Sequence, residues 1–281
     1  MVDLIIKLSG NKKQFSNPKK FSKKMEKASK LSDFHLPDYK FKVPMETIKI
    51  GGYNVYKIGK YNSDKVIMYI HGGAYISPGE RFHYKFVEKL ASTCNIDIYD
   101  VDYPLAPNHT YKDAYKLLLE VYDTFDKEVI IMGDSAGGAL TLSFTMYLRE
   151  LKKKLPSKIV LISPWVDVTM NNPDLVIFEK TDCMTSTYGL VECGKMWAGE
   201  LDRKDYKISP IYGDVKGLPD ILMFAGTREL LYPDLVKMDM IFKLNKVNSK
   251  FIQGYKQGHI YPLYPNKIGD KAVNQIKEFI K

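Results

Sequence analysis

The 281-residue sequence contains little cysteine and no long hydrophobic run. Its three cysteines, Cys94, Cys183 and Cys193, match neither a disulfide framework nor the spacing of a zinc site, so we expect a reduced, cytoplasmic protein. A Cys183–Cys193 disulfide stays open as an alternative. No segment approaches the roughly twenty apolar residues that cross a membrane. The start, MVDLIIKLSG, lacks the continuous apolar stretch and cleavage site of a signal peptide. We therefore expect no integral membrane segment.

Acidic residues are outnumbered, since 42 Lys and Arg against 33 Asp and Glu give a net charge of +9. Much of the excess precedes residue 31, as Lys7, Lys12, Lys13, Lys19, Lys20, Lys23, Lys24, Lys27 and Lys30. Such an arm can bind nucleic acid, an anionic membrane or an acidic partner. The helical spacing of Phe21, Met25 and Ala28 favours a solvated amphipathic helix instead. We expect no nucleic-acid partner. The sequence also lacks a P-loop, a G-x-G-x-x-G turn and a metal cluster, so no cofactor or metal is expected.

The rest of the composition is typical of a globular protein, with 45% hydrophobic and 27% charged residues. From about residue 45 the chain alternates apolar, β-rich runs with helical patterns. METIKI and YNVYKI flank Gly51-Gly52 and predict a hairpin. The later runs are KVIMYI, NIDIYDVDY, EVIIM, KIVLIS, DILMFAG and KFIQGY. Continuous apolar strands separated by helices predict an α/β fold, with a mostly parallel sheet covered by helices on both faces.

Two segments do not fit this alternation. The basic segment 1–44 precedes the first strand. Residues from about 166 to 210 are too many for a simple crossover and indicate an insertion, helical around Thr187 to Trp197. We expect these two segments to form a small helical cap, and residues 45–281 to form the main domain that carries the insertion. Sheets of this type bind ligands at the carboxyl ends of their strands, where the cap would lie.

The stretch VIIMGDSAGGALTLSF, residues 129 to 144, places one serine among small residues between a β-branched run and a helical pattern. Gly133-Asp134-Ser135-Ala136-Gly137 matches the G-x-S-x-G nucleophile elbow, a strand-to-helix turn with serine at its apex. Small neighbours are required because strand and helix approach closely there. A glycine-rich turn with an incidental serine is the alternative. The strand before and the helix after favour a nucleophile, with Asp134 supporting the elbow by hydrogen bonding.

A second turn, YIHGGAYISPG at residues 69 to 79, also lies at the end of a predicted strand. Gly72 and Gly73 have no side chains that would keep a bound carbonyl group away from the backbone. The N–H groups of Gly73 and Ala74, together with that of Ala136, therefore predict a three-donor oxyanion hole.

These two motifs resemble those of the hormone-sensitive-lipase group of α/β hydrolases, in particular its small bacterial carboxylesterases and acetyl esterases. The oxyanion loop His71-Gly72-Gly73-Ala74 is similar to an HGGG motif with alanine at the last position, and residues 133–138 match the GDSAGG elbow in full. DYPLAPNHTYKDA is similar to the YRLAPE segment, with Pro104 and Asn108 in place of Arg and Glu. The resemblance covers roughly residues 45–281 and implies an α/β-hydrolase fold.

The remaining catalytic residues follow from the chain order of this fold, which is Ser, acid, His. The sequence has five histidines, His35, His71, His83, His109 and His259. Only His259 follows Ser135, so it is the expected base. The family's G-x-x-D-x-L segment matches Gly226–Leu231 with Glu229 as the acid. Asp234 is the rival acid, although its place after a proline is more typical of a helix cap.

The expected reaction is hydrolysis of a carboxylic ester through an acyl-enzyme. Its partner is a small acyl ester, and a homodimer is left open. Aromatic residues near strand ends predict a narrow pocket for acetyl to butyryl groups; they are Tyr75, Trp165 and Tyr232 first, then Trp197, Tyr261 and Tyr264. The same triad also permits amidase, formamidase or peptidase activity, and the fold also occurs in non-catalytic binding proteins.

Overall fold

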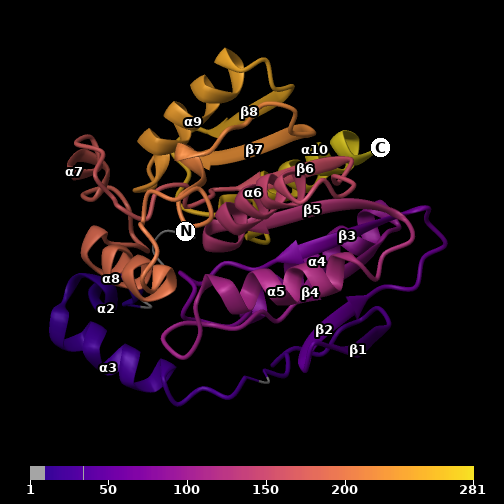
Figure 1. Ribbon diagram of the computed structural model, residues 1–281, viewed down its shortest axis with the longest axis horizontal. Coiled ribbons are helices and arrows are strands. Elements are labelled where there is room, and N and C mark those ends of the chain that lie inside the picture. Colours follow the sequence, from indigo (N-terminus) through magenta and orange to yellow (C-terminus); the bar gives the residue numbers. More distant parts are fainter. Residues whose placement is uncertain (1–9, 34) are drawn as a thin grey trace.

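An eight-stranded sheet runs through the molecule in the order β1-β2-β4-β3-β5-β6-β7-β8 (Figure 1). The computed structural model describes residues 10–33 and 35–281. Its strands are β1 Met45–Ile50, β2 Tyr53–Ile58, β3 Lys65–Ile70, β4 Asp97–Val101, β5 Glu128–Asp134, β6 Lys158–Ile162, β7 Asp220–Gly226 and β8 Ser249–Gly254. Nearly all of MVDLIIKLSG, including Lys7, lies outside the described residues.

Strand pairing confirms the predicted hairpin and the mostly parallel sheet. β1 and β2 pair antiparallel, and β2 pairs antiparallel with β4. The other six strands, in the order β4-β3-β5-β6-β7-β8, are parallel to one another. Parallel neighbours need crossover connections, and the helices between the strands supply them.

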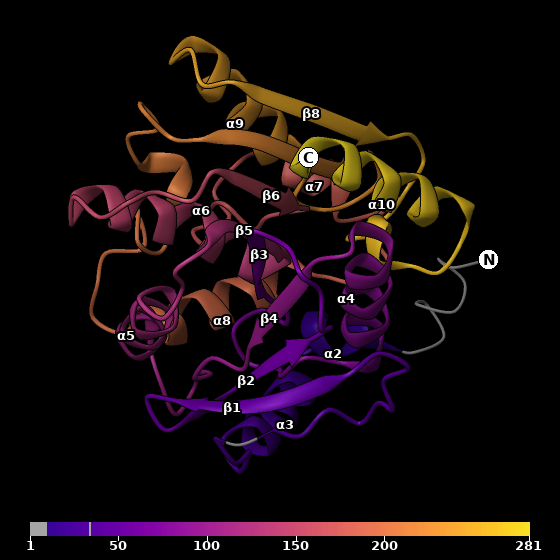
Figure 2. The same ribbon diagram turned by 90° about the vertical axis from the view of Figure 1, so that its right-hand side faces the viewer.

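Helices cover both faces of the sheet. Successive residues of a strand point to opposite sides, so each buried strand contributes side chains to two cores. In β3, Val66, Met68 and Ile70 join one core, while Ile67 and Tyr69 join the other. The first core includes α5 Tyr111–Tyr122, α6 Ser135–Glu150 and α9 Tyr232–Leu244. The second includes α4 Arg81–Cys94 and α10 Lys267–Ile280. Figure 2 shows these two layers on either side of the sheet.

The two segments outside the alternation pack against each other beyond the strand ends. They contribute α2 Asn11–Ser16 and α3 Pro18–Ala28 from the N-terminal segment, and α7 Leu175–Phe178 and α8 Thr187–Ala198 from the insertion. A Cβ on Gly189 would lie 2.4 Å from the Phe15 ring, so this glycine lets α8 approach α2 closely. Lys12 donates from α2 to the backbone carbonyl of Asp182 at 2.7 Å. Figure 1 shows α2, α3 and α8 together.

Residues 18–28 of the basic arm form the amphipathic helix α3, as the spacing of Phe21, Met25 and Ala28 predicts. Phe21 and Ala28 are buried, and Met25 packs against the core. Asn17 caps the helix by accepting from the backbone N–H of Lys20 at 3.1 Å. No described helix is long and apolar enough to cross a membrane. The cysteines form no disulfide, which excludes the alternative bridge in this structure.

Candidate active site

The elbow forms where β5 runs directly into α6. Ser135 has φ +51°, in the left-handed region that non-glycine residues rarely adopt. Its backbone carbonyl accepts from the N–H of Trp165 at 2.9 Å, which holds the turn. A Cβ on Gly133 would lie 2.4 Å from the Gly137 oxygen, and one on Gly137 would lie 2.0 Å from the Ile70 oxygen. Strand and helix therefore meet this closely only because both positions are glycine.

The structure brings three of the expected residues into one hydrogen-bonded row. His259 Nε2 lies 2.8 Å from Ser135 Oγ, and His259 Nδ1 lies 2.9 Å from Glu229 Oε2. Glu229 follows β7 and His259 follows β8, so adjacent parallel strands deliver both side chains to the same edge of the sheet. With Nδ1 donating to the carboxylate, Nε2 carries the lone pair that faces the serine hydroxyl.

Burial and charge shift the pKa of Glu229 and of His259 in opposite directions. Burial raises the pKa of Glu229, and the hydrogen bond and charge of His259 oppose that rise. Burial lowers the pKa of His259, but the hydrogen bond and charge of Glu229 outweigh it, so the pKa is raised. The row thus favours a carboxylate next to an imidazole whose ability to accept a proton is enhanced.

Asp234, the rival acid, lies away from this row. It sits in the first turn of α9, and its Oδ1 accepts from the side-chain amide of Asn172 at 2.7 Å. The expectation that it caps α9 is wrong, because its Oδ1 is bonded to Asn172 of the insertion and its Oδ2 has no hydrogen-bond partner within the described residues. Burial raises its pKa to about 6.

The loop after β3 presents backbone N–H groups beside the elbow. Gly73, Ala74 and Tyr75 have φ of +121°, +55° and +64°. The N–H groups of Gly73 and Ala74 make no hydrogen bond within the described residues, and Ala136 lies in the first turn of α6, where N–H groups lack helical acceptors. A Cβ on Gly73 would lie 2.4 Å from the Ser77 oxygen, so glycine is required there.

Asp134 joins the elbow to this loop. Its Oδ1 accepts from the backbone N–H of Gly72 at 3.0 Å and from the Tyr69 hydroxyl. Its Oδ2 lies 3.4 Å from His83 Nε2. Because His83 Nδ1 accepts from the N–H of Glu80 at 2.9 Å, the proton of His83 is on the nitrogen that faces Asp134. The carboxylate thereby supports both turns, the role expected for it from the sequence.

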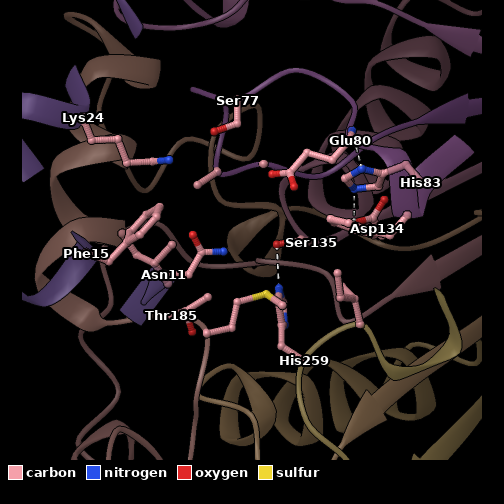
Figure 3. Close-up of a pocket in the computed structure, with 16 residues that line it drawn as sticks. Asn11, Phe15, Lys24, Ser77, Glu80, His83, Asp134, Ser135, Thr185 and His259 are labelled. Atoms are coloured by element: carbon pink, nitrogen blue, oxygen red, sulfur yellow. Dashed lines mark hydrogen bonds and ion pairs between the residues drawn. The ribbon is translucent and has the colours of Figure 1, made fainter. Parts of the chain in front are cut away.

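A pocket that is partly open to solvent leads to Ser135. Its walls come from the two turns, the His259 loop and the helices beyond the strand ends (Figure 3); they include Asn11, Phe15, Lys24, Ser77, Glu80, Met184, Thr185 and Leu190. No group of residues in the described ranges has the composition and geometry of a metal site.

The three residues expected to bind substrate do not line this pocket. Tyr75 stacks on Trp197 at 4.1 Å and on Trp165 at 5.6 Å, and all three side chains are fully buried. Tyr232 donates its hydroxyl to Gln253 and packs on Phe178. Sequence position at a strand end did not distinguish rings that face the pocket from rings packed beneath it.

Several residues of the site were missed from the sequence. Phe15 and Lys24 lie in the N-terminal segment, where only the amphipathic spacing of α3 was informative. Ser163 follows β6 and has φ +47°. Its hydroxyl accepts from the backbone N–H of Ile260 at 3.0 Å, which fixes the loop of His259. The positive φ of Ser163 left no signal in the sequence.

Known proteins share this fold. A family model described as an alpha/beta hydrolase fold matches residues 67–263. The chain is 30% identical over 200 residues to an esterase of Acinetobacter venetianus; the match covers 68% of this chain and 66% of that protein, slightly less than two thirds of its length. A solved Staphylococcus aureus structure described as a candidate esterase is 30% identical, with a TM-score of 0.89 over 97% of this chain and 96% of that one. A hormone-sensitive lipase from a metagenome library is 25% identical, with a TM-score of 0.85 over 99% and 96%.

Proposed function

The chain belongs to the α/β-hydrolase family, and from this premise we propose that it is a serine carboxylesterase of the hormone-sensitive-lipase-like group. The observation that carries the proposal is the row from Ser135 through His259 to Glu229, with contacts of 2.8 and 2.9 Å. A nucleophile within reach of a base that a third group orients is the arrangement that acyl transfer requires.

In the proposed reaction, His259 accepts the proton of Ser135 as the hydroxyl attacks the ester carbonyl. The negative charge that develops on the carbonyl oxygen is stabilised by the N–H groups of Gly73, Ala74 and Ala136. His259 then protonates the leaving alcohol. Water hydrolyses the acyl-enzyme with the histidine acting as base again, and Glu229 stabilises the imidazolium in both halves.

We further propose that the N-terminal segment and the insertion form a cap that limits the acyl group. Phe15, Met184 and Leu190 contribute apolar walls to the pocket next to Ser135, and the glycine at 189 holds two cap helices close together. This supports a preference for acetyl to butyryl esters. We also propose that the protein is cytoplasmic and that its substrate is a small acyl ester.

A panel of p-nitrophenyl esters of increasing acyl length, measured beside a p-nitroanilide, tests this function. We expect kcat/KM to be highest between acetyl and butyryl and the anilide to react much more slowly. A maximum at octanoyl would contradict the short-chain proposal, and preference for the anilide would indicate an amidase.

Labelling by a fluorophosphonate tests the nucleophile independently. Ser135→Ala should lose both label and turnover. Ser143→Ala, on the same helix with its hydroxyl bonded to the carbonyl of Leu140 at 3.3 Å, is the matched control and should retain both. Full turnover in Ser135→Ala would refute the assignment.

A further inference from the structure

A lysine that the reaction does not use extends into the pocket. Lys24 belongs to α3, yet it lines the same pocket as Ser135. In Figure 3 its ammonium group points into the pocket, on the side of Asn11 and Phe15. The ammonium nitrogen lies 5.6 Å from the centre of the Phe15 ring, a cation–π distance that holds the side chain in place.

A second hollow adjoins the pocket and shares Lys24 and Ser77 with it. Its other basic residues are Lys20, Lys23 and Lys27, which follow one face of α3 at helical spacing. We call these four lysines the lysine groove. They place four positive charges along the hollow that adjoins the pocket.

The lysine groove has no counter-ion within the described residues. None of its four lysines forms an ion pair there, and the acidic residue of α3, Glu26, pairs with Lys30 instead at 2.8 Å. Two carboxylates also line the pocket. Asp134 accepts from the backbone N–H of Gly72 and lies 3.4 Å from His83 Nε2. Glu80 is the N-cap residue of α4, and Figure 3 shows its carboxylate directed into the pocket. Like charges three or four residues apart destabilise a helix, so helix stability does not explain the cluster.

We propose that Lys24 and the lysine groove bind an anionic group, such as a carboxylate, on the substrate at a distance from the ester bond. This inference rests on the proposed esterase function and names its substrate class as acid-bearing esters. Lys24 makes the direct contact because it alone of the four lines both hollows. The other three raise the local concentration of anions.

A basic amphipathic helix is also typical of proteins that lie on anionic membranes. That mode requires a free apolar face that can enter the lipid. The apolar face of α3 is already occupied, because Phe21 and Ala28 are buried within the protein at 5% and 7% exposure. A small anionic substrate therefore fits the lysine groove better than a membrane does.

Two matched ester pairs test the proposal. p-Nitrophenyl hemiglutarate and p-nitrophenyl valerate differ by a charge on the acyl side, and 4-acetoxybenzoate and its methyl ester differ by a charge on the alcohol side. We expect kcat/KM to favour the anionic member of at least one pair by on the order of tenfold, as a charge-assisted hydrogen bond gives, mainly through KM. The pair that responds shows which side of the ester carries the acid.

Lys24→Gln should abolish this preference, measured as the ratio of kcat/KM for the anionic and the neutral member of each pair. Lys19→Gln removes the same charge from the same helix outside the lysine groove and should retain the preference. Absence of preference in both pairs, or equal loss in both variants, would overturn the proposal. A membrane role is tested with phosphatidylglycerol vesicles. If the vesicles stimulate turnover of the neutral esters, and both variants lose this stimulation equally, the lysines belong to a membrane surface and the proposal is overturned.

A separate measurement distinguishes failure of this inference from failure of the esterase proposal. Isothermal titration of the two anionic esters into Ser135→Ala measures binding without turnover. If the double variant with Lys24→Gln binds one of these esters more weakly, the anion site is supported even when no ester is hydrolysed. If Lys24→Gln leaves the binding of both esters unchanged, or if neither ester binds, the anion-site proposal is overturned.

Discussion

Replacing Glu229 by glutamine keeps the shape of the side chain and removes its charge. Oε2 lies 2.9 Å from His259 Nδ1, and the side chain is fully buried, so water has no access to take its place. An amide can turn its N–H toward Nδ1. The imidazole proton then moves to Nε2, where it faces Ser135 and prevents the histidine from acting as a base.

We expect Glu229→Gln to lower kcat by about 10⁴, the loss found when the triad acid of a serine protease becomes an amide. This corresponds to about 5 kcal/mol of transition-state stabilisation. Complete burial supports a loss of this size, because solvent does not screen the interaction. KM should change little, since Glu229 does not line the pocket.

The pH profile provides a second readout. Activity requires neutral His259, so it falls as the pH drops through a pKa that lies above the ordinary value of 6.5. Although burial lowers this pKa, the hydrogen bond and charge of Glu229 raise it overall. Glu229→Gln removes those two contributions, so the acid limb of the residual activity should move to lower pH.

Steady-state hydrolysis of p-nitrophenyl acetate from pH 4.5 to 9 measures both effects. Asp234→Asn is the control, because it removes a buried carboxylate that contacts Asn172 and not His259. It should change stability by less than about 1 kcal/mol, because the amide oxygen can still accept from Asn172, and it should leave kcat nearly intact. If Asp234→Asn were the inactive variant and Glu229→Gln the active one, the acid would be misassigned. An acid limb unchanged by either substitution would mean that neither carboxylate acts on His259.

Three further predictions concern buried positions near the site. Gly137→Ala places a Cβ 2.0 Å from the Ile70 carbonyl oxygen and should lower the free energy of unfolding, measured in urea, by about 3 kcal/mol or more. Gly138→Ala is the control: the nearest atom to its Cβ lies at 3.0 Å, so the loss should be less than half as large. Asp100 has a buried oxygen without a partner in the described structure, and burial raises its pKa from 3.8 to about 8. Its folded form therefore holds an extra proton between these values, and stability falls as pH rises through that window. Asp100→Asn should raise Tm more at pH 8 than at pH 5, and an equal gain at both would contradict this. Trp197→Ala empties a fully buried site and should cost about 3–5 kcal/mol by circular dichroism in urea; a cost below 1 would show that the ring is dispensable.

The parts of the fold that follow from local rules could be predicted from the sequence. The β3 and β5 runs were recognisable because residues on both faces of a buried strand are apolar. The elbow was recognisable because its sterics involve neighbouring residues, with glycines at fixed positions around Ser135. The residues that meet through adjacent strand ends, Glu229 and His259, followed from chain order and from the resemblance to a known family.

The walls of the pocket could not be predicted in the same way. Phe15 reaches the pocket because α2 packs on α8, a contact between residues more than 170 positions apart that no local pattern encodes. The placement of Tyr75 was wrong for a related reason. An aromatic residue at a strand end satisfies the same pattern whether its ring faces a ligand or a neighbouring ring.

Both tryptophans of the chain stack on Tyr75, the residue that follows the oxyanion loop. Trp197 belongs to α8, and Trp165 donates its backbone N–H to the carbonyl of Ser135. The indole emission of this protein therefore originates at the boundary between α8 and the elbow. A shift of α8 away from Tyr75 would expose indole to water or change its quenching. The native protein thus carries an unlabelled optical reporter for any movement of α8 relative to the elbow.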